Sequence, residues 1–189
     1  RGREPRLPPR VTIAPSPPPC RGYDVTHKTD DQGVRMTADS NGAELREGVS
    51  AKTDELASQL LGKALDVLAV GEELDVLLAV QDASGAVASY EFADDGPEEC
   101  LEGAHRRVGE LARDHGDPRA HLGEPLRYAL AYRGAIADEK GAYQDAVLLE
   151  FGERGWRSYS AFSLVEVTGD EDTFGWTEPQ PAGELEPLL

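Results

Sequence analysis

The chain has few of the residues on which several protein classes depend. It contains two cysteines, Cys20 and Cys100, in 189 residues, which is too few for a disulfide framework and is not the spacing of a metal site. No apolar run approaches the roughly 20 residues that span a bilayer. Basic residues are scarce, because 19 Lys and Arg stand against 36 Asp and Glu. The net charge of −17 excludes a nucleic-acid binder, which needs clustered positive charge.

Signature motifs are missing as well. The sequence has no Gly-x-Gly-x-x-Gly and no Walker A motif, so it gives no support for a nucleotide or any other cofactor. The first 20 residues lack the apolar centre of a secretory signal. We therefore predict a cytoplasmic protein without a cofactor, a membrane partner or a nucleic-acid partner.

Composition divides the chain into three parts. Residues 1–52 are predicted to be a disordered lead-in. Within it, residues 1–35 hold 7 of the 13 prolines and a net charge of +3, and they are either a Pro-rich arm or a translated leader upstream of Met36. Residues 53–167 carry the periodic apolar pattern of one domain. Residues 168–189 contain six acids and no base, and we expect a flexible acidic tail.

Apolar spacing within the domain predicts two helices and five strands. Helical spacing covers residues 54–70, with Thr53 as the N-cap and Gly71 after the last turn, and it recurs over 97–115. Alternating spacing predicts the strands, which cover residues 73–81, 86–93, 126–135, 143–151 and 156–167.

These elements predict an α+β fold with the order α-β-β-α-β-β-β. Short connections favour a hairpin of the first two strands and an antiparallel meander of the last three. A five-stranded antiparallel sheet with both helices on one face, a two-layer sandwich, fits this order. We expect the serine-rich last strand to be an open edge. The element order over residues 54–167 resembles roadblock and profilin-like domains, which are mostly binding and scaffolding modules.

A second resemblance lies in the strand sequences. One predicted strand ends in Tyr132-Arg133-Gly134, and a later one opens with Asp145-Ala146 and ends near the acid Glu150. This pair resembles small bacterial proteins of uncharacterised function, and the resemblance implies a family without implying an activity.

Two carboxylates and a histidine are the candidates for acid–base catalysis. Asp145 or Glu150 would act with His105 in a small hydrolase. Residues five apart on a strand point to opposite faces, so the two carboxylates do not face one substrate. We favour structural roles, in which Asp145 bonds turn amides and Glu150 pairs with Arg127 or Arg133 on the neighbouring strand.

Thiol, hydroxyl and imidazole groups complete the candidates. Cys100 lies in the first turn of the second predicted helix, where a thiol pKa can be lowered, but three nearby glutamates oppose a thiolate. The serines of the last strand lie outside a nucleophile elbow (Ser158, Ser160 and Ser163). His105 and His115 would lie about 15 Å apart along one helix, too far to share a metal ion.

Three functions remain after these exclusions. The favoured one is a soluble, non-enzymatic module that binds another protein, as a homodimer through a sheet face or edge. Four aromatic residues are its candidate anchors, unless they fold back over the sheet: Phe174, Trp176, Trp156 and Tyr159. The second is an acidic inhibitor or immunity-type protein that covers a basic partner. The third is a small enzyme of unrecognised type, a hydrolase.

Overall fold

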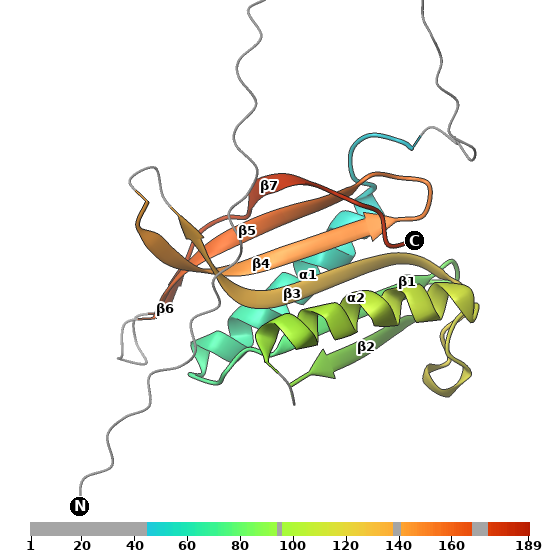
Figure 1. The fold of residues 1–189 in the computed structure, drawn as a ribbon, viewed down its shortest axis with the longest axis horizontal. Coiled ribbons are helices and arrows are strands. Elements are labelled where there is room, and N and C mark those ends of the chain that lie inside the picture. The colour runs from blue at the N-terminus through green and yellow to red at the C-terminus, as the bar shows by residue number, and fades with distance from the viewer. Residues whose placement is uncertain (1–44, 94–95, 138–140, 168–173) are drawn as a thin grey trace, which may run out of the picture.

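The computed structural model describes residues 45–93, 96–137, 141–167 and 174–189 (Figure 1). The predictions made for residues 1–44 and 168–173, including the arm or leader before Met36, lie outside this description.

Two α-helices, seven strands and one 3-10 turn make up the described fold. The α-β-β-α-β-β-β order is confirmed, and two further strands follow it. The elements are α1 (Ala51–Ala69), β1 (Val76–Asp82), β2 (Val87–Phe92), α2 (Pro97–Arg113), η1 (Pro118–Ala120), β3 (Pro125–Ala137), β4 (Tyr143–Glu153), β5 (Ser158–Val167), β6 (Phe174–Trp176) and β7 (Gln180–Leu185).

Local sequence accounts for how the helices begin and end. α1 begins after Ser50, whose side-chain oxygen accepts a hydrogen bond from the Thr53 amide. Ser50 is therefore the N-cap, and the prediction of Thr53 in that role was wrong by three residues. α1 ends where Gly71 adopts a φ of +77°, which glycine adopts at little cost. The predicted apolar stripe of α1 is confirmed, since all six of its residues are buried (Leu56, Leu60, Leu61, Ala64, Leu65 and Leu68).

The strands form one curled antiparallel sheet with the order β2-β1-β3-β4-β5-β6, and β7 also pairs with β5. The predicted hairpin β1–β2 and the meander β3–β4–β5 are both confirmed. The prediction that the sheet has five strands was wrong. So was the prediction that β5 is an open edge, because β6 and β7 lie along its outer side.

The two helices cover opposite faces of the sheet, which corrects the predicted two-layer sandwich to three layers. Odd-numbered β1 residues such as Leu77 pack with α1, whereas even-numbered ones such as Leu78 pack with α2. Figure 1 shows α2 in front of the sheet and α1 behind it. The prediction failed because β1 is apolar on both faces, which is typical of a strand buried between two layers.

Gly152 allows a close approach of β3, β4 and β5 on the α2 side. It lies opposite Tyr128 in the β3–β4 register. A Cβ atom at position 152 would lie 2.2 Å from Ser158 Oγ and 2.8 Å from Tyr128 Cε1, and both neighbours are buried. Only glycine leaves room here for the tyrosine ring beside the buried hydroxyl.

The end of the chain is built into the fold. Phe174 packs against the α1-side core, and Leu188 and Leu189 pack against the α2-side core. Regular structure therefore continues beyond Trp176, and the prediction of a flexible tail was wrong for residues 174–189. Neither helix in the described part of the chain has the length and apolar composition needed to cross a membrane.

Candidate functional site

The structure brings together two of the predicted catalytic residues, Glu150 and His105. His105 Nε2 lies 2.7 Å from Glu150 Oε2, and the Tyr132 hydroxyl donates to Glu150 Oε1 over 2.8 Å. The three side chains come from α2, β4 and β3, so they join the helix to the sheet. The Glu150 side chain is 12% exposed and that of His105 is 34% exposed.

The bonds of this trio indicate a structural role, in which they hold α2 against the sheet. Burial raises the pKa of Tyr132 far above its usual range, and the nearby Glu150 charge raises it further. Tyr132 is therefore a permanent donor at neutral pH. Both carboxylate oxygens of Glu150 are engaged, which is the saturation that buried polar groups require. The predicted pairing of Glu150 with Arg127 or Arg133 was wrong.

Asp145 and Cys100 lie away from this trio. Asp145 accepts a hydrogen bond from Arg133 over 3.0 Å, and both side chains are partly exposed. Asp145 is thus paired with an arginine on the neighbouring strand instead of with turn amides. Cys100 is buried in the α2-side core, with 6% of its surface exposed. A buried thiol of this kind lacks the access that a nucleophile needs.

The three serines of β5 take part in packing and strand pairing. Ser158 and Ser163 are buried, and Ser163 Oγ donates to the Thr177 carbonyl over 2.6 Å. Ser160 Oγ donates to the Gly183 carbonyl. Ser158 and Ser163 were expected to lie on a partly exposed edge strand. That expectation was wrong, because β6 and β7 pair with the outer side of β5.

The three described histidines, His105, His115 and His121, are not gathered into a metal site. His115 and His121 both adopt a positive φ, of 56° and 53°. His115 lies 3.8 Å from Glu124, and both side chains are exposed. Among the described residues, no group of three or more His, Cys, Asp and Glu side chains is placed to hold a metal ion.

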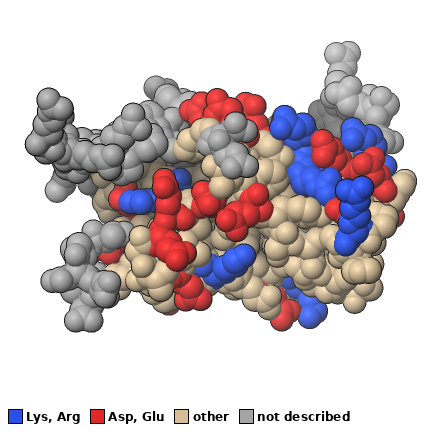
Figure 2. Space-filling model, turned by 90° about the horizontal axis from the view of Figure 1, so that it is seen from below, with Lys and Arg blue, Asp and Glu red and all other residues tan. Residues whose placement is uncertain are grey.

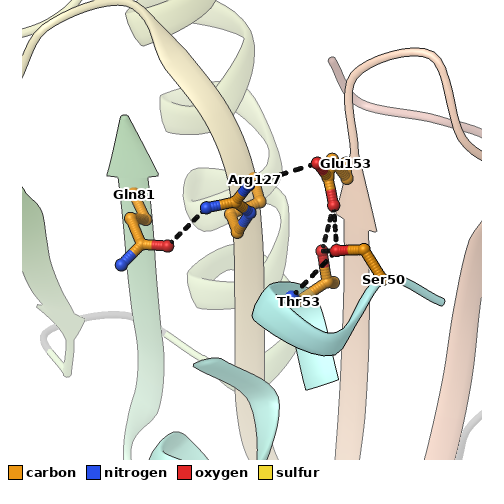
Figure 3. Close-up of polar contacts among 5 residues, drawn as sticks. All are labelled: Ser50, Thr53, Gln81, Arg127 and Glu153. Carbon is orange, nitrogen blue, oxygen red and sulfur yellow. Dashed lines mark hydrogen bonds and ion pairs between the residues drawn. The ribbon is translucent and has the colours of Figure 1, made fainter. Parts of the chain in front are cut away.

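A second polar cluster, which the sequence did not reveal, surrounds Glu153 at the start of α1 (Figure 3). One oxygen of Glu153 accepts hydrogen bonds from the hydroxyls of Ser50 and Thr53. The other lies 3.2 Å from the Arg127 guanidinium, which also donates to Gln81 over 2.7 Å. The Arg127 and Glu153 side chains are each 11% exposed. This cluster ties α1 to three strands of the sheet.

The cluster holds Glu153 in its charged form. Partial burial alone would raise the pKa of Glu153, but the hydrogen bonds from Ser50 and Thr53 and the charge of Arg127 outweigh it. The resulting pKa lies below the usual range of a glutamate. The carboxylate also lies at the positive end of the α1 dipole, which favours a negative charge. Glu153 is therefore a largely buried anion that accepts hydrogen bonds at the N-terminus of α1.

The four predicted anchor residues differ in their contacts and exposure. Phe174 is partly buried against the α1-side core. Trp156 lies beneath the Arg46 guanidinium, 5.5 Å from ring centroid to Cζ, and Tyr159 OH accepts a hydrogen bond from the Gly48 amide. Both hold the segment before α1 against the sheet. Trp176 remains 52% exposed.

A shallow hollow of about 410 Å³ lies on the α1 side, between the segment before α1 and β7. Its lining is mainly apolar and includes Val49, Phe151, Tyr159 and Pro181. Glu184, at its rim, is already bound by the Arg157 guanidinium at 2.8 and 3.0 Å. The hollow can receive an apolar side chain, and two of its polar side chains, Ser160 and Glu184, are already bonded within the chain.

The remaining candidate is the outer edge of β2, called the free edge because no strand among the described residues pairs with it. β2 is the last strand at one end of the sheet order and lies at the lower border in Figure 1. The Asp82 amide donates to the Ala86 carbonyl. Since hydrogen-bonded pairs alternate along an antiparallel ladder, Ala88 and Tyr90 bond to β1 while the amides and carbonyls of three residues point outward (Val87, Ser89 and Glu91). The side chains of these three are also exposed.

Charge is distributed unevenly along this border. Figure 2 looks at it from below and shows acidic side chains over the left and centre and basic ones mostly toward the right-hand end, among further acids. β2 runs from right to left in Figure 1 and ends near the middle of the molecule, where Phe92 pairs with Val76. Exposed acids surround that end on β2, on the turn before β1 and in the first turns of α2 (Glu91, Glu72, Glu73, Glu98, Glu99 and Glu102).

Comparison of the chain with family models, with curated proteins and with solved structures finds no match in any of the three.

Proposed function

We propose that the chain is a non-enzymatic module that binds another protein along the β2 border. The observation that carries this proposal is the row of outward backbone groups at Val87, Ser89 and Glu91 on an exposed strand. An unpaired edge is a template for an added strand, and main-chain hydrogen bonds then supply affinity. β2 carries neither the proline nor the lysine with which exposed edges are usually protected.

The polar groups elsewhere support binding over catalysis. The hydroxyls of Ser158 and Ser163 are buried, and Glu150 is saturated by His105 and Tyr132. A hydrolase would need a nucleophile or an activated water within reach of its base. The trio instead has the bonding of a structural joint between α2 and the sheet.

An acidic inhibitor that covers a basic partner is the second candidate. The gathering of acids at the Phe92 end of β2 favours it, since an even distribution would point to solubility alone. A homodimer through β2 remains a prediction as well. Two chains of net charge −17 repel each other, so a partner of opposite charge is better matched to this border.

Photo-cross-linking from the border tests the proposal. The probe p-benzoylphenylalanine is placed at Val87 in one variant and at Tyr143 in a matched one, and both are illuminated in cells that express the chain. Both side chains are exposed, by 46% and 67%, but Tyr143 begins β4, which β1 and β3 separate from β2. We expect a discrete protein adduct from Val87 that Tyr143 does not form. Equal adducts from both positions, or none from Val87, would contradict the proposal.

A further inference from the structure

We infer that the β2 border takes an extended basic segment of another protein, which adds antiparallel to β2 with its basic residues in its N-terminal half. This inference rests on the proposed function and adds the chemistry and direction of the partner. It follows from the combination of a free strand edge with a charge gradient along that edge.

The direction of the added strand follows from the position of the acids. β2 runs from Val87 to Phe92, and its acidic surroundings lie at the Phe92 end. An antiparallel strand begins beside Phe92 and ends beside Val87. Its first residues therefore lie among the carboxylates, where Lys and Arg are favoured.

Midway along the border, a base stands among the acids. Arg107 lies 2.6 Å from Asp117 and 3.6 Å from Glu110, so these charges are paired within the chain. Its guanidinium also lies 4.8 Å from the Tyr90 ring centroid. At the acidic end, the exposed Arg106 reaches toward Phe92, and it offsets only part of that charge. The gradient therefore distinguishes one end of an added strand from the other.

The register sets which partner side chains matter. Partner residues directly opposite Val87, Ser89 and Glu91 project to the same side as those side chains, because cross-strand pairs share a face. That side of β2 is exposed, whereas Ala88 on the other side is buried against α2. We expect a basic residue opposite Glu91, a small polar or β-branched residue opposite Ser89 and an apolar one opposite Val87.

Two peptides of identical composition test the direction. The probe is the capped octapeptide Lys-Arg-Lys-Val-Thr-Val-Thr-Ser, and its control has the same residues in reverse order. Binding to the full chain is followed by calorimetry and by amide hydrogen exchange. We expect the probe to bind at least about fivefold more tightly than the control, and to slow the exchange of the Val87, Ser89 and Glu91 amides. Higher salt weakens the binding, because exposed charges are screened.

Substitutions in the border complete the test. Glu91→Lys should weaken probe binding by at least about fivefold, whereas Glu178→Lys, the same charge change after β6, should leave it within about twofold. Ser89→Pro removes one outward amide and should abolish the slowed exchange. If Ser89→Pro does not fold, the pair of charge variants carries the test alone.

The outcomes separate the inference from the proposed function. The inference is overturned if the two peptides bind equally, if neither binds, or if binding leaves the three amides unchanged. The proposed function still stands in those cases when Val87 cross-links a partner in cells. Loss of the Val87 adduct removes the proposed function, whatever the peptides do.

Discussion

The two borders of the sheet differ in almost every feature that governs strand pairing. At the β5 border, a bulge at Ser160–Ala161, the edge proline Pro181 and the Arg157–Glu184 ion pair accompany the added strand β7. At the β2 border, a six-residue strand without proline, lysine or a bulge presents the backbone groups of Val87, Ser89 and Glu91 outward. Natural sheets use such devices to prevent edge-to-edge association. Their presence at one border and absence from β2 are the reason why we propose β2 as the place of association.

The half of the molecule next to the β5 border, called the closed half here, should also contribute most of the free energy of unfolding. The Glu153 cluster, Gly152 and the strands after β5 all lie in that half, whereas β2 is attached on one edge alone. Stability measurements on variants in both halves therefore test this difference.

The largest loss is expected from Glu153→Ala. It leaves Arg127 without its carboxylate and removes the acceptor of the Ser50 and Thr53 hydroxyls. Breaking a buried pair in this way costs about 3 kcal/mol in the free energy of unfolding. Urea denaturation measures it, with Glu55→Ala as the control, because Glu55 forms an exposed pair with Lys52. Equal losses of unfolding free energy in the two variants would show that the Glu153 cluster does not stabilise the fold.

A loss of about 2 kcal/mol is expected from Gly152→Ala, because the new methyl group overlaps Ser158 Oγ and Tyr128. The double variant Gly152→Ala with Ser158→Gly should recover part of that loss. Thermal and urea unfolding of the four chains in this cycle give the coupling. Additive effects would show that the close approach of β3, β4 and β5 does not require glycine.

Breaking the joint between α2 and the sheet should cost less. A double-mutant cycle with His105→Ala and Glu150→Ala should give a coupling of about 1 kcal/mol, typical of a partly exposed hydrogen-bonded pair. A coupling near zero would mean that the contact adds nothing. If these variants lost a hydrolytic activity without losing stability, the trio of His105, Glu150 and Tyr132 would have a catalytic role instead of a structural one.

Acid should weaken the closed half through Glu153. Its pKa is lower in the folded chain than the value of about 4.3 in unfolded chains. Its contribution is therefore complete above pH of about 4.3 and is lost as the pH falls through the folded value. Glu153→Gln is less stable at neutral pH, and its unfolding free energy falls less steeply on acidification. Urea titrations from pH 6 to 3 compare the slopes, and identical slopes would contradict this account.

The smallest effect is expected at the open border. Ser89→Pro removes an amide that points away from β1, so it should change the free energy of unfolding by less than about 1 kcal/mol. The neighbouring Ala88→Pro removes a ladder hydrogen bond and disturbs a buried residue, and it should cost at least about 1 kcal/mol more. The reverse order of the two variants would mean that the outward residues of β2 are misassigned.

Local pattern predicted the elements well, and short connections predicted their immediate pairing. The stripe of α1, the hairpin β1–β2 and the meander β3–β4–β5 all follow from spacing and turn residues. Placement across the sheet was beyond this reasoning. β1 is apolar on both faces, so its sequence does not show which helix covers which face. β1 also pairs with β3, although β2 and α2 lie between them in the sequence. The open edge therefore could not be assigned from neighbours in sequence.

The polar sites were harder to predict because their partners are distant in sequence. Ser50 and Glu153 are 103 residues apart, and His105 and Glu150 are 45 apart. Proline and acid content made residues 174–189 look unstructured, yet Pro181 suits an edge strand and Phe174 fills the α1-side core. The free edge had no distinguishing signal in the sequence, because β1, β4 and β5 lack proline and lysine just as β2 does.

Amide hydrogen exchange of the chain without a partner shows whether the outer side of β2 is unpaired. If β2 is a free edge, the amides of Val87, Ser89 and Glu91 exchange rapidly while those of Ala88 and Tyr90 between them exchange slowly. We predict this alternation of fast and slow exchange along β2. Slow exchange at all five positions would show that the outer side of β2 is already paired, and would contradict it.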